Sequence, residues 1–379
     1  MHVLALNMGS TGLKAGLFDA DVGGDARKRN GASIESHNDT APLATRADAL
    51  LAELARSWGL ETAPDMVVHR VVHGGDRDGP TRLTHDELAA LQALSALAPL
   101  HQAPELAVAL AAVQRWPECE HVAVFDTCWH RTMPEIHRHF ALPDALYERG
   151  VRRYGFHGLA FASGMARVAE LAPTWARARV VLAHLGGGSS LCAIRDGASV
   201  NTTMGMTPLG GVAMGTRPGS LDPGVVLHLQ RALGMSDAEI DHLLWRDSGL
   251  QGLSGESGDM RRLLASDSPR ARRAVALYAS LVAQGIAAMA ACIGGLDVLG
   301  FSGGIGQNAP AVRTAICEQL DWMGVRLDSI ANEANCVDLS ASAAPVRVLV
   351  LSIDEEREMV REAILMKKAR DRTCHAAGC

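Results

Sequence analysis

Short apolar runs followed by glycine-rich turns occur at three places in the chain, residues 7–14, 184–190 and 302–308. The first two turns lead into a second apolar run, and this order of strand, glycine turn and strand predicts a β-hairpin. Glycine lets backbone N–H groups approach an anion, because no Cβ stands in the way. Two such hairpins predict an internal duplication with two phosphate-binding turns, and the third turn would contact the rest of a nucleotide.

The two common phosphate-binding motifs do not fit this pattern. The sequence contains no G-x-x-x-x-G-K-[ST], so a Walker-type loop is not indicated. Gly186-Gly187-Gly188 is followed by Ser-Ser-Leu-Cys and not by the start of a helix, so a Rossmann-type turn does not fit either. One glycine turn alone is as often an ordinary tight turn as a binding site. Only the three turns together indicate a nucleotide.

The remaining periodicity predicts a mixed α/β fold. A buried strand over 121–125 ends at Asp126, the place where open α/β sheets bind ligands. Ser236 and Glu239 have the spacing of a capping box at a helix start. The segment 21–48 is polar with weak periodicity, which predicts a loop or an edge region. Other predicted elements are helices over 88–97, 104–113, 237–245, 260–265 and 355–368, and a strand over 346–351.

Residues 274–299 form an apolar stretch long enough to span a bilayer. The stretch is mainly alanine, and Gln284, Gly294, Gly295 and Asp297 interrupt it. These interruptions favour a buried helix that leads into a buried strand.

Composition narrows the function classes. A length of 379 residues with 48% hydrophobic content fits two domains with large cores. A net charge of -6 gives no electrostatic reason to expect nucleic acid or an anionic membrane as partner. The eight cysteines form no C-x-x-C pair with metal-site spacing, and the first residues lack the pattern of a signal peptide. We therefore expect a cytoplasmic protein with reduced thiols.

Charged and hydrogen-bonding residues cluster at glycine-rich turns between the three loops. Each has an ordinary structural explanation when taken alone, such as an ion pair, a core histidine or a helix cap. Together with phosphate-binding hairpins they provide what phosphoryl transfer needs, namely groups that position the substrates and neutralise spreading negative charge. These residues are Arg70, Asp126, His157, Arg217 and Glu355.

Seven motifs in consistent order resemble the acetokinase family, most closely its acetate-specific members, over nearly the whole chain. They are Asn7-x-Gly9-Ser10-Thr11 with Lys14, His69-Arg70-Val71-Val72-His73-Gly74-Gly75, Phe125-Asp126-Thr127, Tyr154-Gly155-Phe156-His157-Gly158, Met214-Gly215-Thr216-Arg217, Gly303-Gly304-Ile305-Gly306 with Asn308, and Asp354-Glu355-Glu356.

This resemblance implies an α/β fold of two duplicated ribonuclease-H-like domains around a cleft, as in actin, Hsp70 and sugar kinases. The first domain would comprise residues 1–127 and be completed by the C-terminal helix, 357–379. The second, 128–356, would carry the nucleotide site and the surface through which the family forms homodimers.

The resemblance also implies the reaction, a reversible phosphoryl transfer from ATP to acetate with Mg²⁺, or Mn²⁺ as a possible substitute. By resemblance, Arg70 and Arg217 would hold the carboxylate and phosphoryl oxygens, and His157 would hydrogen-bond the phosphoryl group. Asp126 would act with the metal, for which Asn7 and Glu355 are the expected ligands. The acyl pocket would consist of Arg70, Val72, Leu100, Phe156 and Pro208. The nucleotide would contact Asn7, Ser10, Lys14, His184, Gly186, Gly187, Gly188, Asp259, Met260, Arg261, Gly304, Ile305 and Asn308.

The sequence departs from the family pattern mainly in the phosphate and nucleotide turns. Gly12 stands where serine is usual, Gly187 replaces asparagine, Gln307 replaces glutamate, and Gln102-Ala103 replaces Asn-Pro. Within the family, propionate or butyrate as acid, another phosphoryl donor, and loss of activity remain alternatives. Outside it, the alternative is an actin- or Hsp70-like nucleotide switch, which has no need for Arg70, His157 and Arg217 together.

Overall fold

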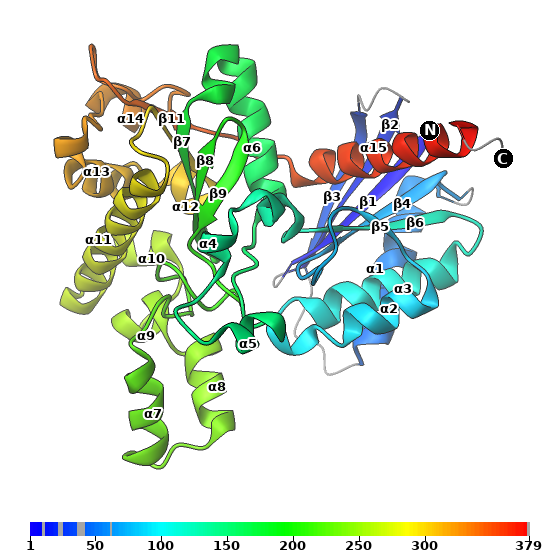
Figure 1. Cartoon of the computed structure of the whole chain (residues 1–379), viewed down its shortest axis with the longest axis horizontal. Helices are drawn as coiled ribbons and strands as arrows, with labels where there is room; N and C mark the ends of the chain where they lie inside the picture. The colour runs from blue at the N-terminus through cyan, green and yellow to red at the C-terminus, as the bar shows by residue number, and fades with distance from the viewer. Residues whose placement is uncertain (10–11, 22–25, 36–41, 61–62, 377–379) are drawn as a thin grey trace. The chain divides into compact units, whose positions relative to one another are not determined.

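The computed structural model describes residues 1–9, 12–21, 26–35, 42–60 and 63–376 (Figure 1). The chain divides into two compact units. Unit 1 contains Met1–Arg131, His157–Leu159 and Asp354–Cys379, and unit 2 contains Thr132–Phe156 and Ala160–Ile353. Unit 1 therefore includes His157 and Glu355, which the sequence-based division assigned to the second domain.

Strands and helices alternate along both units. The strands are β1 (His2–Met8), β2 (Gly12–Ala20), β3 (Ala26–Glu35), β4 (Met66–Val71), β5 (Thr81–Arg82), β6 (Glu120–Phe125), β7 (Arg179–Leu185), β8 (Ser189–Arg195), β9 (Ala198–Thr202), β10 (Val298–Ser302) and β11 (Arg347–Val350). The helices are α1 (Leu43–Trp58), α2 (His85–Gln92), α3 (Gln102–Arg115), α4 (Glu135–Arg138), α5 (Asp144–Glu148), α6 (Gly158–Leu171), α7 (Pro223–Arg231), α8 (Asp237–Arg246), α9 (Gly249–Ser254), α10 (Met260–Leu264), α11 (Pro269–Cys292), α12 (Gly303–Asn308), α13 (Pro310–Glu318), α14 (Ser329–Glu333) and α15 (Glu355–Ala376). Short 3-10 helices cover Ser95–Leu97, Cys128–Thr132, Pro173–Arg177 and Asp321–Met323.

The two sheets share one topology, which confirms the expected duplication. In unit 1, β1, β2 and β3 form an antiparallel meander, β4 is parallel to β1, and β6 is parallel to β4. In unit 2, β7, β8 and β9 repeat that meander, β10 is parallel to β7, and β11 is parallel to β10. The sheet orders are β3-β2-β1-β4-β6-β5 and β11-β10-β7-β8-β9. Each unit thus has the ribonuclease-H-like arrangement.

The sheet of unit 1 is covered on both faces because its strands are apolar on both sides. On one face, Leu4 and Leu6 of β1 pack with Leu51 of α1 and Val108 of α3. On the other, Val3 and Ala5 pack with residues of α15, among them Val360 and Ala363. Figure 1 shows the red helix α15 and the blue-to-cyan helices α1 and α3 on opposite sides of this sheet. Alternate residues of one strand therefore serve two separate core clusters.

In unit 2 the long helix α11 forms one side of the core, next to the sheet. Its inward residues, among them Tyr278, Val282 and Ile286, join β-strand residues such as Leu299 in one cluster. Within the described part of the chain, α11 alone is long and apolar enough to cross a bilayer by length and composition. Its partly buried position, followed by the buried strand β10, matches the expected helix and strand.

Local predictions can be compared directly with the structure. The capping box at Ser236 is present at the start of α8, with both reciprocal hydrogen bonds. Both predicted hairpins form, as β1–β2 and β7–β8. In the described part of segment 21–48, the edge strand β3 confirms the expected edge region, whereas the first turns of α1 were not expected. Charged side chains on β3 hide its periodicity, since an edge strand in contact with solvent needs few apolar residues.

Candidate active site

The first glycine turn connects β1 and β2 in unit 1. Asn7 pairs with Lys14 across the hairpin, and the N–H of Gly9 donates to the carbonyl oxygen of Gly12 at 2.8 Å. The Asn7 side chain is buried, whereas Lys14 is exposed. Ser10, the other expected phosphate contact in this turn, lies outside the described residues.

A buried charge cluster surrounds Arg70, at the end of β4. Its Nε and Nη2 donate to the two carboxylate oxygens of Asp126 at 3.1 and 2.7 Å, and its Nη1 donates to Oδ1 of Asn7 at 3.3 Å. Nδ2 of Asn7 donates to Glu355 at 2.9 Å and to Glu356 at 3.1 Å. Unit 1 thus brings together four expected site residues, from β1, β4, the end of β6 and α15. A guanidinium carries five N–H donors, so two are left for a ligand.

The charges in this cluster shift one another's proton affinities. Burial by itself lowers the pKa of Arg70, but the carboxylates of Asp126, Glu355 and Glu105 raise it well above its ordinary value. Burial raises the pKa of Asp126, and the Arg70 guanidinium opposes this shift only in part. Arg70 therefore stays a cation at any ordinary pH.

His157 lies directly beside Asp126. Its backbone N–H is hydrogen-bonded to the Asp126 carboxylate, and the N–H of Gly158 donates to the Asp126 carbonyl at 3.0 Å. A Cβ at position 158 would come within 2.1 Å of that carbonyl oxygen, so only glycine fits there. His157 has a φ of 59°, which is unusual for a residue other than glycine. Such local strain is common at functional sites, where the surrounding structure holds it.

The acyl-pocket residues expected in unit 1 are Val72 and Leu100. Val72 is buried and follows β4, and Leu100 is half-buried ahead of α3. The loop after Val72 is held by Gln102, whose amide exchanges two hydrogen bonds with the backbone of His73. Glu105 accepts from the N–H of Val72 and was not among the expected residues. Its position on the apolar face of a helix, one turn before Val108 and Ala109, is the sequence signal that could have identified it.

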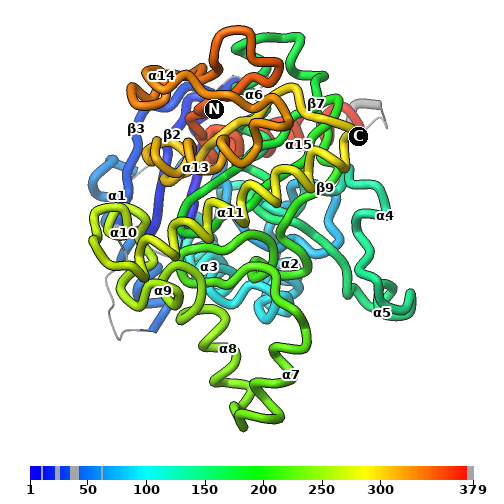
Figure 2. The backbone as a smooth tube through the Cα atoms, turned by 90° about the vertical axis from the view of Figure 1, so that its left-hand side faces the viewer, coloured from blue at the N-terminus to red at the C-terminus, as the bar shows by residue number. Residues whose placement is uncertain are grey.

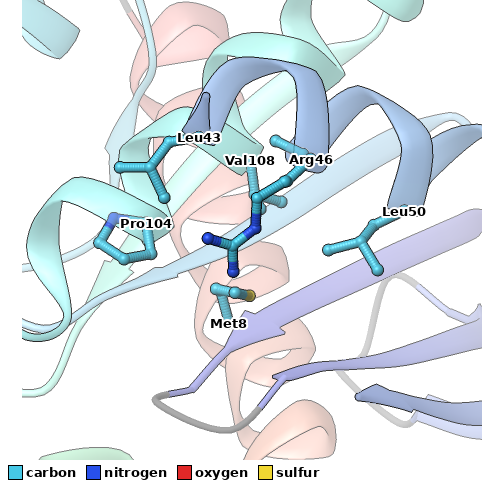
Figure 3. Close-up of a pocket in the computed structure, with 7 residues that line it drawn as sticks. Met8, Leu43, Arg46, Leu50, Pro104 and Val108 are labelled. Carbon is cyan, nitrogen blue, oxygen red and sulfur yellow. The ribbon is translucent and has the colours of Figure 1, made fainter. Parts of the chain in front are cut away.

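A small crevice lies at the end of β1, between α1 and α3 (Figure 3). Met8, Leu50 and Val108 line it together with Arg46, whose guanidinium points toward Met8 (Figure 3). Its volume of about 10 Å³ holds no more than a single water molecule. The crevice is therefore a packing gap behind the first turn and not a ligand site.

The second glycine turn, between β7 and β8, lies in unit 2 next to two other loops. The N–H of Gly215 donates to the carbonyl of Gly187 at 3.2 Å, and a Cβ on Gly186 would lie 3.8 Å from the backbone nitrogen of Gly304. At Gly187 a Cβ would meet nothing within 4 Å. Unit 2 therefore brings together the turn 186–188, the loop before Arg217 and the start of α12. His184, at the end of β7, contacts Oγ of Ser302 through its ring at 3.1 Å.

Arg217 is buried in unit 2, and its Nη1 donates to the carbonyl of Pro208 at 2.9 Å. Burial lowers the pKa of Arg217 to about 10. Among the described residues, no carboxylate forms an ion pair with it. Phe156, the other acyl-pocket residue expected in this unit, is also buried.

The residues expected at the adenosine occupy two short helices of unit 2. Ile305 is buried in α12, and Nδ2 of Asn308 donates to the Gly304 carbonyl at 2.9 Å. Asp259 caps α10 and forms an ion pair with Arg261 at 2.7 Å. The side chain of Met260 belongs to the hydrophobic core, so only its backbone is available to a ligand.

Arg313 braces α12 and was also missed from the sequence. Its guanidinium is fully buried and donates to the carbonyls of Gly306 and Gln307 at 2.9 Å each. Further bonds reach Asn332 and the side chain of Asn335. One arginine within helix α13 gives no sequence signal for this role, because its partners come from elsewhere in the chain.

Part of the Arg70 cluster suits a hard divalent cation. Magnesium is commonly held by one or two carboxylates together with waters and substrate phosphates. The carboxylate of Glu355 supplies oxygen atoms of this type, while the neighbouring Asn7 turns its Nδ2 toward Glu355 and its Oδ1 toward Arg70. Within the described ranges, no group of three His, Cys, Asp or Glu side chains has the geometry of a closed metal cage. The donor set thus fits a cation that is shared with phosphate.

Comparisons with known proteins identify the family. The sequence profile of the Acetokinase family matches residues 2–361. An acetate kinase from Methylocella silvestris is 46% identical over 325 residues, which cover 84% of this chain and 80% of the relative. An acetate kinase from Nitrobacter hamburgensis is 39% identical over 376 residues, covering 93% of both chains.

Solved structures agree with the sequence comparisons. The acetate kinase of Porphyromonas gingivalis superimposes with a TM-score of 0.82 at 32% identity, over 96% of this chain and 99% of the other. A propionate kinase from Francisella tularensis gives a TM-score of 0.85 at 29% identity, over 95% of this chain and 98% of the other. Because the family profile and these relatives span nearly the whole sequence, the chain belongs to the acetokinase family.

Proposed function

We propose that this chain is an acetate kinase, a phosphotransferase with a carboxyl group as acceptor. It transfers the γ-phosphoryl group of ATP to acetate, giving acetyl phosphate and ADP, and catalyses the reverse reaction as well. The observation that carries this proposal is the buried Arg70 cluster, in which an arginine fixed by Asp126 and Asn7 retains two N–H donors and is followed, two residues later, by the buried apolar residue Val72. A nucleotide switch has no use for such a carboxylate-binding group.

The chemistry requires no general base. A carboxylate is already ionised at neutral pH, so its oxygen attacks the γ-phosphorus directly while the bond from phosphorus to the ADP oxygen breaks. The obstacle is repulsion between two anions, and Arg70 and Arg217 offset it by hydrogen-bonding the carboxylate and phosphoryl oxygens. His157 would donate a further hydrogen bond to the phosphoryl group. The backbone N–H groups of Gly186, Gly187 and Gly188 would contact the phosphate chain of ATP.

A divalent cation, which we propose to be Mg²⁺, would bind Glu355 and the side-chain oxygen of Asn7, with Asp126 arranging its waters. When bound, it would neutralise charge on the nucleotide phosphates. Asp126 meanwhile holds the guanidinium of Arg70 side-on, which fixes the direction of its remaining donors.

A hydroxamate assay tests the function. The enzyme is incubated with hydroxylamine, Mg²⁺, one phosphoryl donor and one acid, and acyl phosphate is trapped as the coloured hydroxamate. We expect the highest kcat/KM with ATP and acetate, lower activity with propionate, and little with butyrate. Pyrophosphate and GTP serve as alternative donors, because Gly12, Gly187 and Gln307 alter the nucleotide turns. Absence of product with every pair would refute the proposal, and preference for propionate would place the chain with the propionate kinases.

We further propose a cytoplasmic homodimer that associates through α7 and α8 of unit 2, a helical pair that extends away from the rest of that unit (Figure 2). None of the residues of α7 is buried within the chain. Leu221, Val225, Leu227 and Leu233 expose 40 to 63% of their surface, which is unusual for so many neighbouring apolar side chains. Light scattering after gel filtration should give the mass of a dimer, and Leu227→Asp should give a monomer.

A further inference from the structure

Glu105 is a buried carboxylate in the first turn of α3, with 2% of its surface exposed. A buried carboxylate costs free energy unless its oxygens find partners, so such residues seldom occur without a reason. The neighbouring helix positions hold Leu106, Val108 and Ala109, which pack in the core as α3 requires. Packing alone would be served better by another apolar residue at position 105.

The two oxygens of Glu105 point at two different parts of the acid site. Oε2 accepts a hydrogen bond from the N–H of Val72 at 2.8 Å. Oε1 lies 3.6 Å from Nη1 of Arg70, and it accepts no hydrogen bond from the described residues. Arg70 is the penultimate residue of β4, and Val72 directly follows the strand. One carboxylate therefore accepts a hydrogen bond from the backbone of Val72 and faces the guanidinium of Arg70.

Gln102, one turn earlier on α3, shows what a purely structural contact looks like in this place. Its amide oxygen accepts from the N–H of His73 at 3.0 Å, and its amide nitrogen donates to the carbonyls of His73 and Leu91 at 3.1 Å each. Gln102 is neutral, its contacts are all with backbone, and it has no contact with Arg70. Glu105 differs because it carries an ionisable group and leaves one oxygen facing the guanidinium.

We propose that Glu105 is a positioning residue for the acid substrate: its hydrogen bond to the backbone N–H of Val72 holds that residue at one fixed spacing from the guanidinium of Arg70, which faces its other oxygen. This inference rests on the proposed function, since it assigns Glu105 to the acetate side of that site. Fixed spacing matters because acetate is small and must contact both parts at once. Glu105 itself does not touch the reacting atoms.

The proposal predicts different results for two substitutions at one position. Glu105→Ala removes the tether to Val72, and we expect it to raise KM for acetate about tenfold, the effect of losing one buried hydrogen bond. Glu105→Gln keeps an oxygen for the Val72 N–H and removes the carboxyl group that faces Arg70. For Glu105→Gln we expect a KM for acetate at or below that of the wild-type enzyme. KM for ATP should change less than about twofold in both variants, because the nucleotide turns are untouched.

Leu106→Ala is the matched control on the same helix. Leu106 is buried next to Glu105 but forms no polar contact with Arg70 or Val72, so its truncation leaves a cavity without cutting the tether. Steady-state kinetics with varied acetate and varied ATP are measured for the wild type and the three variants, together with thermal unfolding. We expect Leu106→Ala to lower the melting temperature and to leave KM for acetate unchanged.

The outcomes separate this inference from the proposed function. A wild-type enzyme that forms no acyl phosphate contradicts the proposed function. An active wild type with equal acetate KM values in wild type and Glu105→Ala contradicts the inference alone, as does a Glu105→Gln variant as impaired as Glu105→Ala. If Glu105→Ala does not fold, Glu105→Gln decides, and an acetate KM more than about threefold above wild type overturns the inference.

Discussion

Arg70 in unit 1 and Arg217 in unit 2 are both buried, yet they have opposite electrostatic surroundings. Arg70 is bound side-on by Asp126, and the carboxylates of Glu355 and Glu105 add to the negative charge around it. Arg217 donates to the neutral carbonyl of Pro208, and burial lowers its pKa to about 10. In sequence the two arginines look alike, since each lies in a glycine-rich motif.

The two arginines therefore contribute to anion binding in different ways. The charge of Arg70 is already balanced within the protein, so Arg70 offers directed hydrogen bonds more than net attraction. No charge among the described residues balances Arg217, so the free enzyme carries the free-energy cost of a buried charge without an ion-pair partner. An anion that binds beside Arg217 removes this cost. We therefore expect Arg217 to supply most of the attraction for phosphate, and Arg70 to supply most of the geometry.

Replacing each arginine by alanine should give the largest effects and should separate the two roles. Both Arg70→Ala and Arg217→Ala should lower kcat/KM by roughly two to four decades, because each removes a charged transition-state partner. Arg70→Ala should also destabilise the fold by about 3–5 kcal/mol, since it leaves buried carboxylates unpaired, whereas Arg217→Ala should change stability by less than about 1 kcal/mol. Acyl phosphate formation and urea unfolding measure the two effects. Equal losses of stability would contradict the contrast.

Arg313 adds a third case to the comparison of Arg70 with Arg217, because its buried guanidinium in unit 2 has hydrogen-bond partners but no carboxylate among them. Its guanidinium donates to five oxygen atoms of four neutral residues, Gly306, Gln307, Asn332 and Asn335. Arg313→Met should cost about 3 kcal/mol of stability, because it leaves several buried oxygens unpaired. It should also raise KM for ATP more than KM for acetate, since α12 loses its brace. If KM for acetate rises more than KM for ATP, Arg313 does not support the nucleotide-binding part of unit 2.

Val72→Ala tests the apolar wall next to Arg70. The shorter side chain leaves room for about one methylene group, which is worth no more than about 1–3 kcal/mol in discrimination. The ratio of kcat/KM for propionate to that for acetate should therefore rise by about tenfold. Leu91→Ala, which truncates another buried residue of unit 1, is the control for general loosening. An unchanged ratio would show that Val72 does not line the acyl pocket.

We expect the smallest effect from a substitution of Glu362, which tests how far the excess of carboxylates around Arg70 extends in unit 1. Burial and the nearby Glu358 raise the pKa of Glu362 from 4.5 to about 7. Between pH 4.5 and 7 the carboxyl group of Glu362 is protonated in the folded state and ionised in the unfolded chain. Its contribution to the free energy of unfolding is therefore complete below pH 4.5 and is lost as pH rises through 7. Glu362→Gln should therefore stabilise the protein by about 1–2 kcal/mol at high pH and have no effect at low pH. Unfolding free energies measured at roughly pH 8.5 and roughly pH 4, above and below the interval between the two pKa values, provide the check.

The sequence predicts the strands and turns that form this site better than the buried residues that hold them in place. The hairpins and Asp126 could be placed because glycine turns and strand ends have local patterns. Arg313 could not be placed, because its partners lie on other elements, and for Glu105 the sequence holds only the signal of a carboxylate on an apolar helix face, without its partners. The hydrogen bond from Asn7 to Glu355 joins residues 348 positions apart, and only the finished fold brings them together. Val72, by contrast, was identified through its motif, and its contact with Glu105 emerged only from the structure.

Helix α15 has a consequence for how the protein is made. The core of unit 1 combines strands from the first residues, such as β1, with Val360 and Ala363 from the last helix. A ribosome therefore releases nearly the whole chain before that core can close, while unit 2 is already fully synthesised. Domains usually fold in the order of synthesis, N-terminal first. In this chain α15 follows all of unit 2, so we expect unit 2 to complete its core before α15 covers its face of the unit 1 sheet.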